Sequence, residues 1–248
     1  MQHTTTRDGH RLAYVKTEGA GPGVVFLGGF ASDMTGTKAV ALEAWAKRHG
    51  RAFLRLDYSG HGASEGQFEA GCIGQWRDDA LHVIAEAMPG ANVLVGSSMG
   101  GWIACLLARD HPDRVAGLVT IAAAPDFTED GYWAAFTEAQ RLEVFEKGRV
   151  LIPSDYGAPY PITRRLIEDG RDQLVLRSAL PVPGPMRLLQ GTADADVPPA
   201  WATRLLDHVE CDDAQLLLVK GADHRFSEPR EIALIEAAVE DVLARIPG

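Results

Sequence analysis

The sequence predicts an α/β fold with a mainly parallel central sheet and helices on both of its faces. Short apolar runs alternate with longer stretches of helical periodicity along most of the chain. The runs are mostly apolar, as expected of strands that are covered on both sides. Parallel strands need such helical connections, because the chain must cross back to the same edge of the sheet. The length of 248 residues fits a single domain spanning 1–248.

The predicted strands are runs of four to eight mostly apolar residues, and the predicted helices repeat apolar residues every three or four positions. In chain order we expect a hairpin region around 11–16, a strand at 24–27, a helix at about 37–49, a strand at 52–57, a helix at about 73–87, a strand at 91–95, a helix at 101–108 and strands at 115–122, 186–190 and 214–219. The glycine-punctuated connections between them predict loops.

The alternation breaks between residues 125 and 185, which we interpret as a cap inserted after the strand at 115–122. This stretch is rich in proline and carries two helical patterns, near 133–146 and 162–168. It therefore predicts a helical cap over one edge of the sheet. The stretch also contains a set of aromatic residues, namely Phe127, Tyr132, Trp133, Phe136, Phe145, Tyr156 and Tyr160.

The pentapeptide Gly96-Ser97-Ser98-Met99-Gly100 lies between a predicted strand and a predicted helix. G-x-S-x-G in this context is typical of a nucleophile elbow, in which Ser98 occupies a strained turn with its hydroxyl exposed. Such a turn leaves no room for a Cβ atom two residues to either side. The helix N-terminus behind it favours developing negative charge. The alternative is an ordinary glycine-rich turn, and Ser97 is expected only to fit the crowded backbone.

A serine nucleophile needs a base and a group that orients the base. His224 follows the strand at 214–219 and is the candidate general base, whereas His61, in an earlier loop, is a weaker candidate for lining the site. Asp194 follows the strand at 186–190 and is the candidate acid. Sites in open parallel sheets form at the carboxyl ends of the strands. The chain order Ser, Asp, His is the one typical of this elbow.

Two further carboxylates compete with Asp194. Asp196 lies two residues later, and we expect it to cap the helix that Pro198 and Pro199 open. Asp223 precedes His224 and is expected to shape its turn. We prefer Asp194 because the first turn after the strand points toward the expected pocket.

The loop after the strand at 24–27 is expected to complete the site. A developing oxyanion needs two N–H donors, and we assign them to Met99, directly after the nucleophile, and to Phe30. Gly28 and Gly29 would let the backbone turn, although a plain glycine turn is the alternative. Candidate pocket residues are Gly29, Phe127, Trp133 and Tyr160, and the alternative is that the cap aromatics fill the core of the cap itself.

Composition narrows the function classes further. The formal net charge of −10 argues against binding to nucleic acid or to anionic membranes. No apolar segment is long enough to predict a transmembrane helix, and no signal region opens the chain. Cys72, Cys105 and Cys211 form neither a metal-binding spacing nor a disulfide framework. We therefore expect a cytoplasmic protein with no cofactor and no metal.

These features together resemble the α/β-hydrolase superfamily over nearly the whole chain. Residues 29–39, 55–64 and 95–102 are similar to the abhydrolase-domain-containing protein 10 group, whose members are mitochondrial palmitoyl-protein thioesterases that also cleave acyl glucuronides. The resemblance implies a Ser-His-Asp triad, oxyanion donors at the positions named above, and a small acyl ester or thioester as substrate. A transit-like extension is missing, which favours a bacterial cytoplasmic homologue.

The same scaffold supports other reactions, so alternatives stay open. They are a carbon–carbon bond hydrolase, a lyase, a cofactor-free peroxidase, a serine peptidase and a non-catalytic binding module. A haloalkane dehalogenase is disfavoured, because it needs a carboxylate where this chain has Ser98. The acyl chain, the leaving group and the oligomeric state are not predicted.

Overall fold

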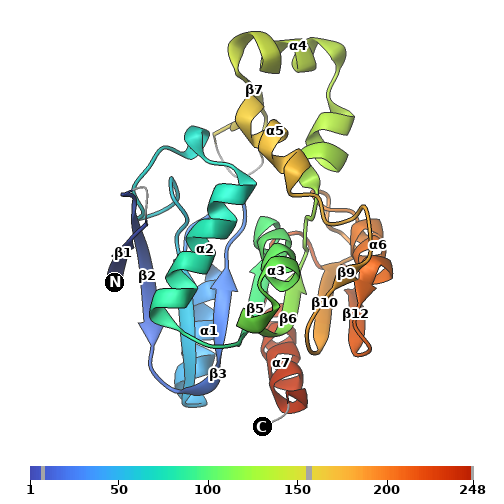
Figure 1. Ribbon diagram of the computed structural model, residues 1–248. Coiled ribbons are helices and arrows are strands. Elements are labelled where there is room, and N and C mark those ends of the chain that lie inside the picture. Colours follow the sequence, from blue (N-terminus) through green and yellow to red (C-terminus); the bar gives the residue numbers. More distant parts are fainter. Residues whose placement is uncertain (7–8, 155–157, 247–248) are drawn as a thin grey trace.

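The computed structural model describes residues 1–6, 9–154 and 158–246, and it has a large, mainly parallel sheet (Figure 1). Eight of the described strands form this sheet in the order β1-β2-β4-β3-β5-β6-β10-β12. The six strands from β4 to β12 are parallel to one another, and β1 and β2 form an antiparallel edge. Their bounds are β1 (Gln2–Thr5), β2 (Arg11–Thr17), β3 (Ala20–Leu27), β4 (Arg51–Leu56), β5 (Asn92–Ser97), β6 (Val115–Ile121), β10 (Met186–Gly191) and β12 (Ala214–Val219).

Helices cover both faces of the sheet, which confirms the predicted fold class. α1 (Thr37–Arg48) and α7 (Pro229–Arg245) pack on one face, and α2 (Ile73–Ala87), α3 (Met99–Asp110) and α6 (Pro199–His208) on the other. Short 3-10 turns lie at η1 (Phe68–Ala70) and η2 (Pro112–Arg114). Within β3, Val24 and Phe26 join the core under α1 and α7, whereas Val25 and Leu27 join the core on the other face. Successive residues thus enter opposite cores, which is why the strand is apolar at these positions.

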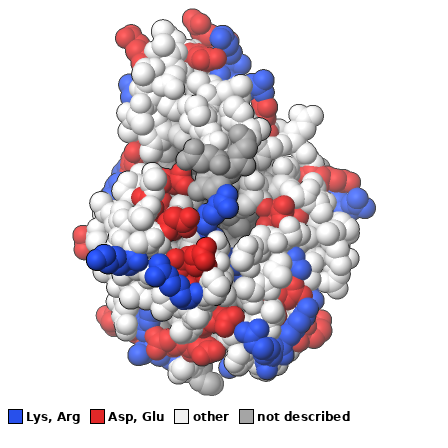
Figure 2. Space-filling model, turned by 180° about the vertical axis from the view of Figure 1, so that it is seen from behind, with Lys and Arg blue, Asp and Glu red and all other residues white. Residues whose placement is uncertain are grey.

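The charged surface seen from behind the molecule carries both signs side by side (Figure 2). Outside the grey atoms, no broad area of one sign is visible on this face. Among the described helices, none combines the length and apolarity that crossing a bilayer requires.

The segment between β6 and β10 projects beyond the carboxyl edge of the sheet (Figure 1). Its elements are the π-helical segment η3 (Phe127–Trp133), α4 (Glu138–Lys147), β7 (Arg149–Ile152), β8 (Tyr160–Thr163), α5 (Arg164–Asp172) and β9 (Leu180–Pro181). β9 pairs with β11 (Val209–Glu210) of the sheet-bearing part, whereas β7 and β8 form an antiparallel pair. The cap is therefore not purely helical as we expected.

The two helices expected in the cap have other bounds in the structure, and local capping explains both differences. The helix expected at 133–146 is interrupted at Thr137, which forms a capping box with Gln140 and so begins a new helix there. The helix expected at 162–168 starts only at Arg164, because Thr163 caps it and Ile162 belongs to β8. Tyr156, one of the aromatic residues noted in the sequence, lies outside the described residues.

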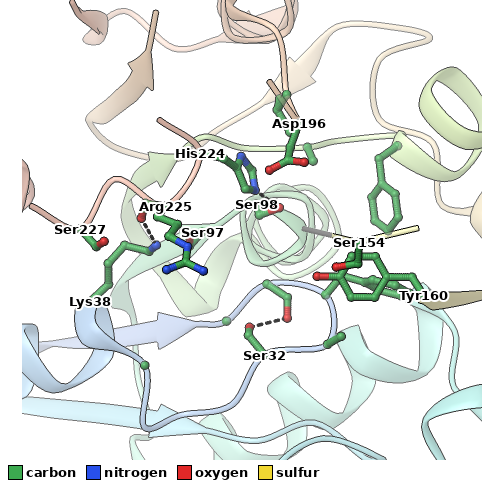
Figure 3. Close-up of a pocket in the computed structure, with 18 of the residues that line it drawn as sticks. Ser32, Lys38, Ser97, Ser98, Ser154, Tyr160, Asp196, His224, Arg225 and Ser227 are labelled. Atoms are coloured by element: carbon green, nitrogen blue, oxygen red, sulfur yellow. Dashed lines mark hydrogen bonds between the residues drawn. The ribbon is translucent and has the colours of Figure 1, made fainter. Parts of the chain in front are cut away.

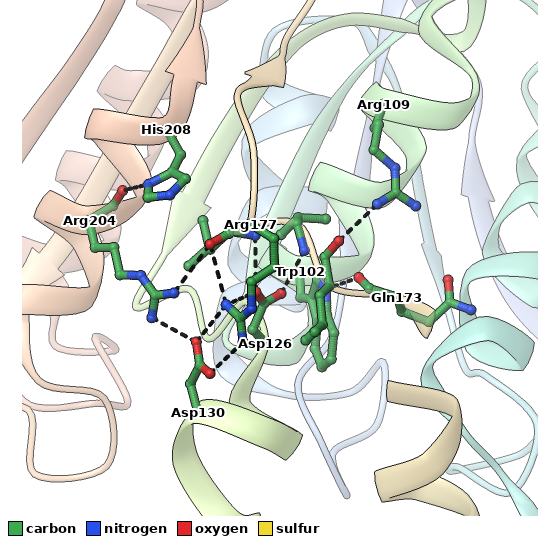
Figure 4. A network of polar contacts seen from close by, with 11 residues as sticks. Trp102, Arg109, Asp126, Asp130, Gln173, Arg177, Arg204 and His208 are labelled. Atoms are coloured by element: carbon green, nitrogen blue, oxygen red, sulfur yellow. Dashed lines mark hydrogen bonds and ion pairs between the residues drawn. The ribbon is translucent and has the colours of Figure 1, made fainter. Parts of the chain in front are cut away.

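Asp126 connects the start of the cap segment to the residues that follow α5 (Figure 4). Its carboxylate is fully buried and accepts hydrogen bonds from the backbone N–H groups of Val175 and Leu176, at 2.8 and 3.0 Å. Arg177 also contacts it, at 3.1 Å. Burial raises the pKa of this carboxyl, although the backbone donors oppose the shift. Residue 126 lies near the start of the segment and residues 175–177 lie between α5 and β9, so one side chain connects two distant parts of the cap segment.

Replacing Asp126 with Ala is expected to lower the free energy of unfolding by about 3 kcal/mol or more, because two buried N–H groups lose their acceptor. Asp126→Asn retains one acceptor oxygen and tolerates the left-handed backbone at this residue (φ 61°), so its loss should be smaller. Urea unfolding measures both. Asp172→Ala, at an exposed position on α5, is the control, and a loss no larger for Asp126→Ala than for this control would contradict the assignment.

Candidate functional site

Ser98 lies between β5 and α3 with φ 54° and ψ −119°, a strained conformation for a residue with a side chain. Its N–H donates to the Ile121 carbonyl at 2.9 Å, and its own carbonyl accepts from Gly101 and Ala124. A Cβ atom on Gly96 would lie 2.3 Å from the Gly100 carbonyl oxygen. The turn is therefore as crowded as the glycine spacing predicted.

Ser98, His224 and Asp194 form a continuous hydrogen-bonded chain (Figure 3 shows Ser98 and His224). His224 Nδ1 lies 2.9 Å from Asp194 Oδ2, and His224 Nε2 lies 3.1 Å from Ser98 Oγ. An ionised carboxylate only accepts hydrogen bonds, so Nδ1 carries the proton of a neutral imidazole. Nε2 is then the acceptor for the Ser98 hydroxyl proton. This arrangement can transfer that proton when the hydroxyl oxygen attacks an electrophile.

Sheet order brings these three residues together. β10 pairs in parallel with β12, so the loops that carry Asp194 and His224 leave adjacent strand ends. Burial raises the pKa of the Asp194 carboxyl, but hydrogen bonds from His224 and from the backbone N–H of Val197, with a smaller contribution from Gln190, outweigh it and hold that pKa below its ordinary value. Asp194 therefore stays ionised beside the imidazole at neutral pH.

Asp196 does not cap α6 as we expected. The N-cap of this helix is Pro198, and no side chain caps it. The Asp196 backbone N–H instead donates to Asp194 Oδ1 at 3.0 Å, and its side chain lines the cavity beside His224 (Figure 3). Asp223 does shape its turn, because its carboxylate accepts from the Phe226 N–H at 3.1 Å.

Among the described residues, Asp194, Asp196 and His224 form a group whose spacing could hold a metal ion. One potential ligand atom from each lies within 4.8 Å of the others. However, both Asp194 oxygens already accept two hydrogen bonds each, from the backbone of residues 196 and 197 and from Gln190 and His224. A bound ion would have to displace the imidazole, so we do not assign a metal to this group.

The loop that carries Phe30 lies against the nucleophile. A Cβ atom on Gly29 would be 3.3 Å from Ser98 Cβ, and Met99 is the first residue of α3, where N–H groups have no acceptor within the helix. The Phe30 ring contacts the rings of Phe68 in η1 and Trp76 in α2. It also contacts Phe127 and Tyr160 in the cap, at ring-centroid distances of 5.7 and 5.5 Å.

A cavity of about 780 Å³ opens above Ser98 and His224, between the cap and the sheet (Figure 3). This volume lies within the usual range for small-molecule sites. Of the expected pocket residues, Gly29, Phe127 and Tyr160 line it. Trp133 is absent from its described lining, and this expectation was wrong. The Trp133 ring packs against Phe136 and Phe145 instead, as the alternative of a separate cap core proposed.

Sequence reasoning missed several residues of the cavity wall. Tyr132, whose ring contacts Phe127, and Trp201 also line the cavity. Lys38 and Arg225 lie at the end away from Tyr160 (Figure 3). Lys38 donates to the Arg225 carbonyl, and burial lowers the pKa of Lys38 to about 8 although Asp223 opposes the shift. Arg225 follows His224 directly, so its position in the chain was an available signal. The others depend on long-range packing.

His61 is buried beside this cavity rather than within its described lining. The side chain is 3% exposed and borders a smaller cavity of about 260 Å³, and its ring contacts Phe68 and Trp76 at 5.0 Å. Nδ1 lies 3.2 Å from the Ser59 carbonyl oxygen. Burial lowers the pKa of His61 from 6.5 to about 4.

This pKa shift predicts an acid-sensitive stability. At His61 the unfolded chain binds more protons than the folded chain between about pH 6.5 and 4, so the contribution of this residue to the free energy of unfolding falls as the pH is lowered through this window. The contribution of His61 is about 3 kcal/mol. His61→Phe keeps an aromatic ring but cannot titrate, so its unfolding free energy should fall less, as chemical denaturation at each pH would measure. The exposed His3→Phe is the control, and parallel profiles for His61→Phe and the wild type would contradict this prediction.

Comparison with known proteins adds four matches. The family model described as serine aminopeptidase, S33, matches residues 22–164. Palmitoyl-protein thioesterase ABHD10, mitochondrial, from Rattus norvegicus is 36% identical over 237 residues, which cover 95% of this chain and 80% of that protein. Among solved structures, one from Agrobacterium vitis S4 matches with a TM-score of 0.91, 39% identity and coverage of 100% and 97%. Mouse alpha/beta hydrolase domain-containing protein 10 matches with a TM-score of 0.91, 33% identity and coverage of 99% of each chain.

Proposed function

The chain belongs to the ABHD10-like group of α/β hydrolases, and we propose that it is a serine hydrolase that cleaves carboxylic ester or thioester bonds. One observation carries this proposal. His224 bridges Ser98 and Asp194, at 3.1 and 2.9 Å, at a strained elbow that faces a cavity. Serine, base and acid in this geometry are the requirements for nucleophilic acyl transfer.

The proposed reaction has two halves. Ser98 Oγ attacks the acyl carbonyl carbon while His224 Nε2 takes the hydroxyl proton, and Asp194 stabilises the resulting imidazolium. The bond to the alcohol or thiol then breaks, and His224 returns the proton to the leaving oxygen or sulfur. Water, deprotonated by the same imidazole, attacks the acyl-enzyme and releases the carboxylic acid and free Ser98.

The oxyanion of each tetrahedral intermediate is proposed to accept hydrogen bonds from the Phe30 and Met99 N–H groups. The closeness of Gly29 to Ser98 supports the first donor, and the place of Met99 at the helix N-terminus supports the second. The Phe30 ring contacts Phe68 and Trp76 on one side and the cap on the other, and these contacts would keep the Phe30 N–H group in place.

The aromatic side of the cavity supports an acyl group as the part of the substrate that binds there. Phe127, Tyr132, Tyr160 and Trp201 offer apolar surface to it. The relatives named as palmitoyl-protein thioesterases favour thioesters among the substrates, and we extend that expectation to this chain as part of the proposal. A cytoplasmic location stays a prediction.

Labelling by a fluorophosphonate probe tests the proposal, together with hydrolysis of p-nitrophenyl esters from acetate to palmitate. We expect mass mapping to find the probe on Ser98, and the chain-length optimum to report the size of the acyl pocket. Cleavage of aminoacyl anilides without cleavage of esters would favour a peptidase instead, in line with the description of the matching family. Folded protein that neither reacts nor turns over any of these substrates would contradict a hydrolytic role for Ser98.

A further inference from the structure

Gln190 is a buried polar residue near the end of a mostly apolar strand that also contains Arg187. It lies in β10 and is 0% exposed. Its Nε2 atom faces three acceptors, namely Asp194 Oδ2 at 2.9 Å, the Val197 carbonyl at 3.0 Å and the Gly191 carbonyl at 3.3 Å. Rotating the amide would place Oε1 against these oxygens, so the contacts themselves determine which end of the amide is the donor.

The same carboxylate oxygen accepts from Gln190 and from His224. Oδ1 of Asp194 is occupied by the backbone N–H groups of Asp196 and Val197, at 3.0 and 2.7 Å, and Oδ2 by Gln190 and His224, at 2.9 Å each. Gln190 is thus the second side-chain donor to Asp194 in the described structure. Together the four donors leave the carboxylate one orientation, in which Oδ2 points at the imidazole.

Gln190 achieves this at a cost to its own hydrogen bonding. Its Oε1 atom is buried and has no partner among the described residues. Leaving a buried acceptor unpaired is unfavourable, and an apolar side chain of similar size would avoid the penalty. The two preceding residues of the strand, Leu188 and Leu189, are buried apolar side chains. The presence of an amide at this position is therefore better explained by the hydrogen bonds that Nε2 donates than by packing.

We propose that Gln190 is a positioning residue for the hydrolytic reaction. It orients the Asp194 carboxylate so that Oδ2 accepts the His224 Nδ1 proton, and this leaves His224 Nε2 as the acceptor toward Ser98. Gln190 also connects Asp194 to the Val197 carbonyl and so fixes the loop that carries the acid. The inference rests on the proposed function and adds a residue to it that touches neither substrate nor nucleophile.

Gln190→Met tests this role, because it keeps the side-chain length and removes the donor. We expect kcat to fall about 10- to 100-fold, as is typical when an outer partner of an active group is lost, while KM changes little. The Tm should stay equal or rise, since the unpaired oxygen is also removed. Gln75→Met is the matched control. Gln75 donates to Ser59 Oγ at 2.9 Å, and neither residue is in the described cavity lining, so kcat should be unchanged.

Gln190→Glu provides a second readout that does not depend on the first variant folding. The introduced carboxyl group, when protonated, would donate to Asp194 as the amide does. When ionised, it would add a second negative charge facing Asp194, Asp196 and His224. Two neighbouring carboxylates share one proton at low pH. The ratio of kcat/KM for this variant to that of the wild type should therefore fall as the pH rises.

The outcomes separate the two proposals. The proposed function would be overturned if the wild-type protein showed no turnover, or if its turnover did not depend on Ser98. An active wild type whose Gln190→Met variant has a lower Tm but unchanged kcat would instead make Gln190 a structural residue and overturn this inference alone. A pH-independent ratio for Gln190→Glu would overturn it too. Loss of kcat at an unchanged Tm, with a ratio that falls with pH, supports it.

Discussion

Ser98→Ala is expected to lower kcat/KM for p-nitrophenyl esters by about 10⁴-fold or more, because the hydroxyl group proposed to form the acyl-enzyme is removed. The fold should survive. Ala differs from Ser only by the hydroxyl oxygen, and the backbone contacts of residue 98 with Ile121, Gly101 and Ala124 do not involve that oxygen. Circular dichroism and Tm measured beside the kinetics would separate lost chemistry from lost structure.

Ser97→Ala is the matched control for this experiment. Ser97 is the neighbouring serine of the same elbow, is 5% exposed and pairs with Ile121 as the last residue of β5. We expect it to retain probe labelling and kcat/KM within about tenfold of the wild type, the scale of an indirect effect on the turn. Activity that survives Ser98→Ala, or labelling that is lost only in Ser97→Ala, would show that the nucleophile is assigned to the wrong residue.

Gly100→Ala is expected to destabilise the protein by about 4 kcal/mol or more, or to prevent folding. The added Cβ atom would lie 2.1 Å from the Leu27 carbonyl oxygen and 2.6 Å from that of Gly28. These are backbone atoms of the neighbouring strand and its loop, so no rotation of a side chain can relieve the contact. Because the same loop carries Phe30, any protein that does fold should also lose activity. Guanidinium unfolding and probe labelling measure the two effects.

Gly36→Ala is the control for a glycine whose replacement meets no obstacle. Residue 36 precedes α1 with φ −59°, and the nearest atom to its added Cβ would be the Asp33 carbonyl oxygen at 3.6 Å. We expect a change in unfolding free energy within about 1 kcal/mol, because both backbone and space accept a side chain. Similar losses in the two variants would mean that the elbow is less crowded than the structure indicates.

Most strands of the sheet and the helices between them could be predicted because their signals are local, although β1 and α7 were not expected. α2 and β12 begin and end at the expected residues, and β5 and β6 differ from expectation by one or two positions. An apolar run or a helical repeat can be recognised in a window of about ten residues. Each pattern reflects burial of the element on one or two faces. The cap was predicted less well, since the capping box of Thr137 and Gln140 and the pairing of β7 with β8 override the helical pattern.

The candidate site divides in the same way. The glycine spacing marked Ser98, and chain order together with strand ends marked Asp194 and His224, so these three could be selected before any distance was known. The sequence itself therefore determined the α/β architecture, the strained elbow and the identity of the hydrogen-bonded chain. Each of these follows from steric limits or periodicities that act over a few neighbouring residues.

Only the tertiary structure decided which other residues surround Ser98, His224 and Asp194. It placed the Asp196 side chain at the cavity wall and not at a helix cap, packed the Trp133 ring against Phe136 within the cap, and buried Gln190 against Asp194. It also brought Lys38 into contact with Arg225, 187 positions further along. Such neighbours arise when segments far apart in the chain pack together. Composition and local spacing carry no record of those contacts, because the free energy that selects them comes from the packing of the whole fold.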